Sequence, residues 1–189
     1  MKNAILAAED ERFYQPGGVD YVSVLRAALT NLVSGTQQGA GTITMQVARN
    51  FFLTREKTLT RKLREVLLAW KIEANLTKDE ILELYVNQIF LGQRAYGFAA
   101  AAQIYFGKPL KDLSPAEAAM LAGLPKAPSA FNPVTNPKRA KIRQEYVLRR
   151  MHDLRYLSDA EHEQARNAPL AIRQGVRESV PVRAAFVAE

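Results

Sequence analysis

Two carboxylates stand out along the sequence, Glu9 and Glu65, because each is set among basic and apolar residues. Glu9 opens the segment 9–13, Glu-Asp-Glu-Arg-Phe, and Glu65 closes the segment 61–65, Arg-Lys-Leu-Arg-Glu. A partly buried carboxylate beside a like charge such as Asp10 has a raised pKa, which makes it a base that works near neutral pH. Two such acids suit acid–base chemistry on a sugar.

Both acids also have an ordinary explanation. Glu9 and Asp10 can be the solvated first turn of a helix. Arg61 and Glu65 stand four residues apart and can form a surface ion pair worth only about 0.3–0.5 kcal/mol. Residue types alone leave these explanations open.

Cations near the second acid would suit a phosphate. Arg61, Lys62 and Glu65 can share one side of a helix. A pyrophosphate leaving group needs cations or a metal to neutralise its growing charge. Arg49 is also suitable, because a planar guanidinium binds two oxygens at once. The alternative for the segment around Arg49 is an ordinary N-terminal helical turn.

Helix signals dominate the elements that must position these residues. Capping boxes begin at Thr77, Ser114 and Ser158, and Gly123 is suited to end the second of these helices. Residues 60–76 carry an apolar stripe at helical spacing, which predicts their buried face: Leu63, Val66, Leu67, Trp70 and Ala74. No substantial segment alternates with period two, so the sequence predicts a mainly α fold.

Composition limits the class of protein. The chain has 189 residues, 48% of them hydrophobic, which suits one globular domain with room for two lobes. Its net charge of +7 favours anionic partners: phosphates, an acidic membrane surface or nucleic acid. No stacking pattern or recognition helix supports nucleic acid, so we expect none. With no cysteine, disulfides and thiolate metal sites are excluded.

Five segments, in this order and spacing, resemble the motif blocks of glycosyltransferase family 51, the peptidoglycan glycosyltransferase domain of class A penicillin-binding proteins. They read EDERFYQPGG, GAGTITMQ, RKLRE, KDEILELYVN and RQEYVLRRM. The resemblance extends from about Ala4 to Met151 and includes the text between the blocks.

The resemblance implies a mainly α, lysozyme-like helical domain with a smaller membrane-facing jaw lobe. We expect the glycosyltransferase domain over residues 1–168, with the jaw at about 19–61. Residues 169–189 then form an exit segment toward a transpeptidase domain. In the family a membrane anchor precedes the domain, so we interpret the chain as a fragment of an enzyme on the periplasmic or outer face of the bacterial cytoplasmic membrane.

The resemblance also implies the reaction and its residues. Lipid II would be polymerised into β-1,4-linked glycan with inversion and release of undecaprenyl pyrophosphate. Glu9 would be the base that takes the proton from the 4-hydroxyl of the acceptor sugar. Glu65 would be the second essential acid and a candidate ligand for a divalent cation such as Mg²⁺. The implied substrate-binding residues are Asp10, Phe13, Thr42, Gln46, Arg49, Asn50, Arg61 and Lys62.

The sequence departs from the family pattern at four positions. Pro16 replaces a usual histidine, Gly41 a serine, Met45 the first glutamine of a pair, and Gln144 an arginine. Pro16 and Met45 remove polar groups from the region of the site. A catalytically weakened lipid II-binding fragment is therefore the main alternative function.

A lysozyme-like enzyme that cleaves glycan is the second alternative, but it would not need Arg49, Arg61 and Lys62 around a pyrophosphate. The fourth and fifth blocks are expected to play supporting roles. Arg143, in the fifth block, is interpreted as part of a packing helix with basic edges.

Overall fold

The computed structural model describes residues 1–15, 42–52 and 59–173. Within these ranges the chain is helical, and an isolated bridge between Phe90 and Tyr96 is the β pairing found there. The mainly α prediction is confirmed. Most of the proposed jaw at 19–61 and of the exit segment at 169–189 lies outside the described residues, so both boundaries stay predictions.

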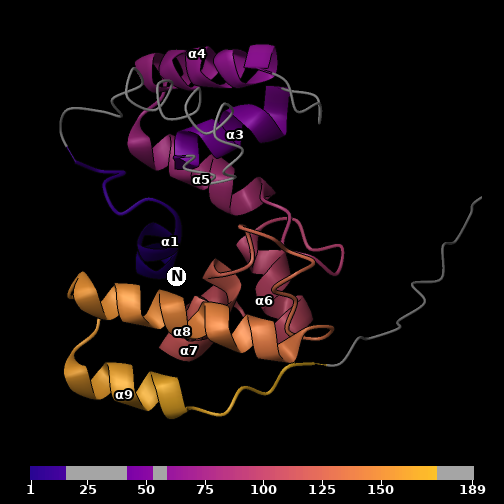
Figure 1. The fold of residues 1–189 in the computed structure, drawn as a ribbon, viewed down its shortest axis with the longest axis vertical. Helices are drawn as coiled ribbons and strands as arrows, with labels where there is room; N and C mark the ends of the chain where they lie inside the picture. The colour runs from indigo at the N-terminus through magenta and orange to yellow at the C-terminus, as the bar shows by residue number, and fades with distance from the viewer. Residues whose placement is uncertain (16–41, 53–58, 174–189) are drawn as a thin grey trace, which may run out of the picture.

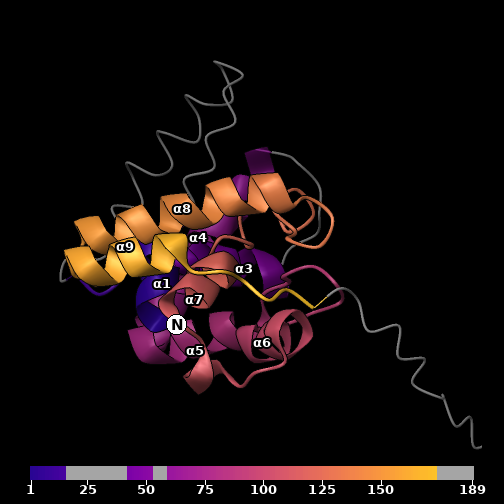
Figure 2. The same cartoon turned by 90° about the horizontal axis from the view of Figure 1, so that it is seen from below.

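The larger group of helices surrounds the main core (Figures 1 and 2). Its elements are α1 (Lys2–Glu9), α6 (Phe98–Phe106), a 3-10 turn η1 (Leu110–Asp112), α7 (Pro115–Ala122), α8 (Pro137–Asp153) and α9 (Asp159–Asn167). Helix α1 packs on α7 and α8, and four successive residues in its middle are buried. This short apolar helix therefore carries Glu9, its last residue, into the interior.

A second group consists of α3 (Ile43–Phe52), α4 (Leu59–Asn75) and α5 (Lys78–Gln88). Helix α3 packs on both α4 and α5 within this group. Its Ile43 and Val47 belong to the main core, whereas Met45 and Ala48 join a small second core on α4. Helix α3 is therefore held by apolar contacts on two sides, and these contacts fix the position of Gln46 between them in the sequence.

The predicted helix starts are confirmed. Thr77, Ser114 and Ser158 each accept a hydrogen bond from the backbone three residues on, and the glutamate there accepts one in return. These boxes satisfy amides that the first turn of a helix leaves free. Helix α7 ends at Gly123, as predicted.

The predicted buried face of α4 is wrong. Val66 is buried, but Leu63, Leu67 and Trp70 are 44%, 57% and 62% exposed. Glu65, expected beside the apolar stripe, is fully buried. The reason is that α4 contacts α3 through small and medium side chains, so its contact face is narrow and leaves the larger apolar residues outside.

Candidate active site

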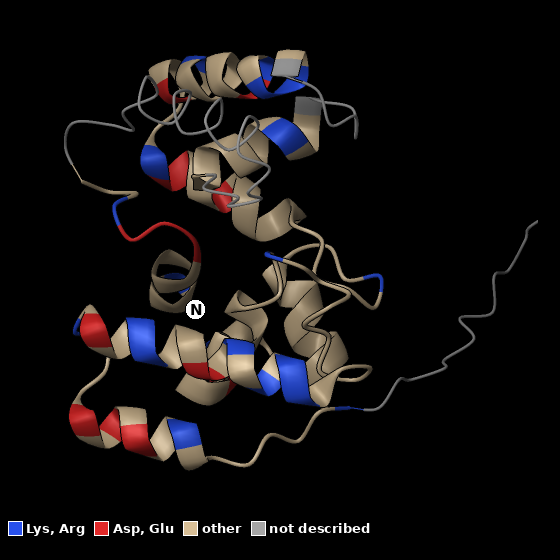
Figure 3. Cartoon of the chain, viewed as in Figure 1, with Lys and Arg blue, Asp and Glu red and all other residues tan. Residues whose placement is uncertain are grey.

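Glu9 lies at the end of α1, where the acidic segment passes between the two groups of helices (Figure 3). Its Oε2 accepts a hydrogen bond of 2.8 Å from Gln46 Nε2 on α3. Its Oε1 lies 3.5 Å from Arg143 Nη2 on α8. The Glu9 side chain is only 10% exposed, so the solvated-turn explanation is wrong.

Burial raises the pKa of Glu9, because a shielded carboxylate loses the hydration of its charged form. The hydrogen bond from Gln46 and the charges of Arg143, Lys126 and Arg49 act in the opposite direction. The predicted direction is confirmed, although burial and not the neighbouring Asp10 is its main cause. The result is a carboxylate suited to act as a base.

The two oxygens of Glu9 differ. Oε1 is buried and accepts no hydrogen bond from any residue that the structure describes. The Tyr85 hydroxyl, also buried, has no hydrogen-bond partner in the described part of the chain either. Burial, followed by the charge of Glu9, raises the pKa of Tyr85 well above its usual value. Oε1 is therefore the oxygen of Glu9 with acceptor capacity left for a substrate proton.

Asp10 and Thr42 hold the start of α3. Asp10 Oδ2 accepts a hydrogen bond of 3.3 Å from the backbone N–H of Ile43, and Thr42 Oγ1 accepts one of 3.2 Å from that of Met45. Both contacts satisfy amides of the first helical turn. They fix the helix that directs Gln46 at Glu9, and their implied contact with substrate stays a prediction.

Phe13 is part of the core, with 2% of its surface exposed. Lys78 Nζ lies 4.7 Å from the centre of its ring, a cation–π contact from α5. The same ammonium contacts Glu73 at 2.6 Å. These contacts give Phe13 a structural role, and its implied substrate contact is untested.

Glu65 is the second shielded acid. Its Oε1 accepts a hydrogen bond of 2.9 Å from Lys62 Nζ, and the carboxylate is fully buried. The surface-pair explanation for this acid is therefore wrong. Oε2 of Glu65 is buried without a hydrogen-bond partner among residues 1–15, 42–52 and 59–173. Arg61, one residue before Lys62, is half-buried.

The two remaining candidate residues of α3, Arg49 and Asn50, differ in burial. Arg49 is half-buried, and its charge acts on both Glu9 and Tyr85. Asn50 is exposed. The structure thus brings Gln46 and Arg49 to Glu9 but leaves Asn50 at the surface.

Arg143 is the neighbour of Glu9 that sequence reasoning missed. It is 8% exposed and lies on the same face of α8 as Ala140 and Val147, which are fully buried. An arginine in such an apolar row signals a buried cation that needs an anionic partner. Lys126, after α7, is a second cation that acts on Glu9 and that the sequence did not single out.

Two departures from the family pattern can be placed. Met45 is fully buried in the small core with Ala48, Val66 and Ala69, so it fills an apolar position. Pro16 and Gly41 lie outside the described residues.

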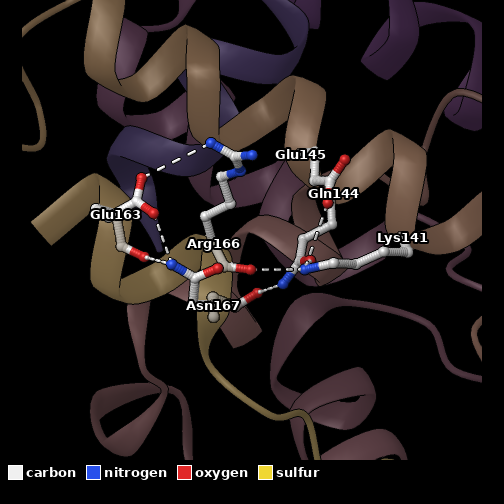
Figure 4. A network of polar contacts seen from close by, with 7 residues as sticks. Lys141, Gln144, Glu145, Glu163, Arg166 and Asn167 are labelled. Atoms are coloured by element: carbon white, nitrogen blue, oxygen red, sulfur yellow. Dashed lines mark hydrogen bonds and ion pairs between the residues drawn. The ribbon is translucent and has the colours of Figure 1, made fainter.

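Gln144 uses both ends of its amide: Nε2 donates to the Ala116 carbonyl at 2.8 Å, and Oε1 accepts from Lys141 at 2.9 Å (Figure 4). Lys141 also donates to the Arg166 carbonyl. In this chain Gln144 therefore ties α8 to α7 and, through Lys141, to α9.

A helical domain with two shielded carboxylates fits an enzyme that carries out acid–base chemistry on a sugar. Comparison with known proteins agrees. The family model described as Transglycosylase matches residues 1–152. Penicillin-binding protein 1A of Neisseria gonorrhoeae is 59% identical over 190 residues, which cover 100% of this chain and 24% of that protein. A protein named as a transglycosylase in Cupriavidus necator is 61% identical, covering 92% of this chain and 75% of the relative.

A solved structure is also similar. The crystal structure of penicillin-binding protein 1A from Haemophilus influenzae matches with a TM-score of 0.51 and 38% identity, over 73% of this chain and 18% of that one. The chain belongs to the transglycosylase family, the peptidoglycan glycosyltransferases. It spans about a quarter of the length of its penicillin-binding protein 1A relatives.

Proposed function

We propose that this domain polymerises lipid II into β-1,4-linked glycan and releases undecaprenyl pyrophosphate. The observation that carries the proposal is the asymmetric carboxylate of Glu9. One oxygen is held by Gln46, and the other is buried with no hydrogen-bond donor among the described residues. A base needs such a fixed orientation together with one oxygen whose lone pairs are not already taken by a hydrogen-bond donor of the protein.

In the proposed reaction, Glu9 Oε1 takes the proton of the acceptor 4-hydroxyl while that oxygen attacks the anomeric carbon of the donor sugar. The bond from the anomeric carbon to the phosphate oxygen breaks, and its electron pair leaves with the pyrophosphate. Attack opposite the leaving group turns an α linkage into a β linkage. Gln46 keeps the Glu9 carboxylate in place during the transfer.

Lys62, Arg61 and Arg49 are the cations proposed to receive the pyrophosphate. Glu65 holds the Lys62 ammonium at 2.9 Å, so this charge stays fixed before the donor arrives. Preorganised charge of this kind stabilises a developing anion more than mobile side chains do.

A divalent cation such as Mg²⁺ at Glu65 stays a prediction. Glu65 Oε2 is the oxygen that could bind it, since Oε1 already contacts Lys62. No group of three or more acidic, histidine or cysteine side chains that could hold a metal occurs in the described part of the chain. The described residues do not form a complete protein-built metal site, and no step of the proposed reaction depends on one.

Sizing the products made from labelled lipid II tests the proposal. We expect strands that lengthen with time. A lysozyme-like enzyme would instead shorten added glycan, and a weakened binding fragment would retain lipid II without converting it. Either outcome would contradict the proposed function.

The pH dependence of kcat/KM should report the raised pKa of Glu9. Only the ionised carboxylate accepts a proton, so activity should fall as the pH drops through that pKa. We expect the acidic limb to lie above the usual glutamate value of 4.5. Measuring kcat/KM from pH 4 to pH 9 checks this. A rate that stays constant down to the usual value would show that Glu9 ionisation does not control turnover.

The proposed partner surface is an anionic membrane. Most of the membrane-facing jaw expected at 19–61 lies outside the described residues. Helix α4 offers Leu63, Leu67 and Trp70 on its exposed side, flanked by the exposed cations Arg64 and Lys71. Apolar side chains beside basic ones are typical of helices that lie in the bilayer interface, where tryptophan is favoured. No described helix is long and apolar enough to cross a membrane.

Replacing Leu67 and Trp70 by serine should therefore weaken binding to vesicles that contain anionic lipid, since the exposed apolar area is lost. Flotation with anionic vesicles measures this, with Ile142→Ser as the control because Ile142 is 68% exposed on α8. Unchanged flotation of the double variant would contradict membrane contact through α4.

A further inference from the structure

We infer that Arg143 is a positioning residue for Glu9 and that Gly123 is glycine because the Arg143 side chain passes over it. The inference rests on the proposed function, in which Glu9 is the base. It assigns a role in the reaction to α8, whose motif block was expected only to support the fold, and to the end of α7.

The Arg143 guanidinium is held on several sides. Its Nη2 lies 3.5 Å from Glu9 Oε1, and its Nε donates a hydrogen bond of 3.4 Å to the Gly123 carbonyl. The guanidinium carbon lies 4.6 Å from the ring centre of Tyr146 and 5.9 Å from that of Phe131. A planar cation fixed between rings and a carbonyl cannot easily turn away from the carboxylate.

Gly123 has no backbone reason to be glycine. Its φ of −77° and ψ of −19° are ordinary right-handed values that any residue adopts. A Cβ atom at this position would instead lie 2.8 Å from Arg143 Cγ, closer than real Cβ atoms come. The nearest backbone atom, the Met120 carbonyl oxygen, is at 3.4 Å, which is ordinary contact. A methyl group at Gly123 would therefore act mainly by displacing Arg143.

The geometry gives Arg143 a particular task. At 3.5 Å its N–H is beyond the usual 2.7–3.2 Å of a good hydrogen bond, so it acts on Oε1 through its charge. Oε1 can therefore still accept a proton from the 4-hydroxyl of the acceptor sugar, while the charge of Arg143 stabilises the ionised Glu9 carboxylate.

The other groups that act on Glu9 come from three further places in the chain. They are Gln46 and Arg49 on α3, Tyr85 on α5 and Lys126 after α7. Among the cations, Arg143 lowers the pKa of Glu9 most, ahead of Lys126 and Arg49. Without the Arg143 charge, burial should raise the pKa of Glu9 further.

The test titrates Glu9 in the full 189-residue chain by carboxyl-carbon NMR and measures kcat/KM with lipid II across pH. For Arg143→Gln we expect the Glu9 pKa and the acidic limb of the rate profile to rise together, by about one unit, which is about a tenfold loss of rate on that limb. Arg143→Lys should restore part of the shift. Lys138→Gln, at an exposed position of the same helix, is the control and should leave both unchanged.

Gly123→Ala provides a second test that leaves Arg143 itself unchanged. It should shift the Glu9 pKa in the same direction when Arg143 is present and add nothing in the Arg143→Gln background. An unchanged Glu9 titration in Arg143→Gln, or equal effects of Gly123→Ala in both backgrounds, would overturn the inference. Because the titration needs no turnover, a chain that shows these shifts but makes no glycan would contradict the proposed function and leave the positioning role standing.

Discussion

Glu9→Gln should abolish glycan polymerisation while lipid II still binds. The amide keeps the shape of the side chain but cannot accept the acceptor proton, and a positioned general base contributes about 10²- to 10⁴-fold to a rate. Turnover of labelled lipid II and equilibrium binding are to be measured side by side. Glu83→Gln, at an exposed position of α5, is the control.

The loss of activity in Glu9→Gln should not result from a less stable fold. The pKa of Glu9 is raised in the folded protein, so its ionisation opposes folding, and this cost grows as the pH rises from the unfolded pKa through the folded one. The neutral amide removes the cost, so at neutral pH the variant should be at least as stable as the native chain. Turnover above about one hundredth of the native rate would exclude Glu9 as the base.

Lys62→Ala should have the second large effect, in two ways. It removes the charge-assisted contact proposed between Lys62 and the pyrophosphate, so donor binding should weaken. It also leaves the fully buried Glu65 carboxylate without its ammonium partner, and breaking a buried pair costs about 3 kcal/mol of folding free energy or more. Donor binding can be followed with an unreactive lipid II analogue, and stability by denaturant unfolding.

Two comparisons separate the effects of Lys62→Ala. Lys111→Ala removes an exposed lysine of η1 and should change neither quantity. Adding Glu65→Gln to Lys62→Ala should recover stability, because the unpaired buried charge is gone, but not donor binding. Donor affinity that is unchanged in Lys62→Ala, or regained in the double variant, would show that Lys62 only neutralises Glu65.

Local sequence signals predicted the helix boundaries well because capping is a local interaction. The boxes at Thr77, Ser114 and Ser158 each involve residues three apart, and all are present in the structure. The motif blocks likewise identified Glu9 and Glu65, both of which the fold shields from water.

Contacts between distant segments were not predictable from the sequence. The apolar row around Arg143 indicates that this cation is buried, but only the packing of α8 against α1 shows that its partner is Glu9. The prediction of which face of α4 is buried was wrong for a related reason. Periodicity finds the stripe that contains Trp70, but the narrow contact with α3 decides that Glu65 faces inward.

If Glu9 is the base in transfer from a lipid pyrophosphate donor, the stoichiometry of the reaction should show it. The native chain is incubated with lipid II, and the new glycosidic bonds and the released undecaprenyl pyrophosphate are counted in the same sample. We expect one pyrophosphate for each new β-1,4 bond, and neither product with Glu9→Gln. New bonds without pyrophosphate, or equal yields from the Glu9→Gln variant, would contradict this mechanism.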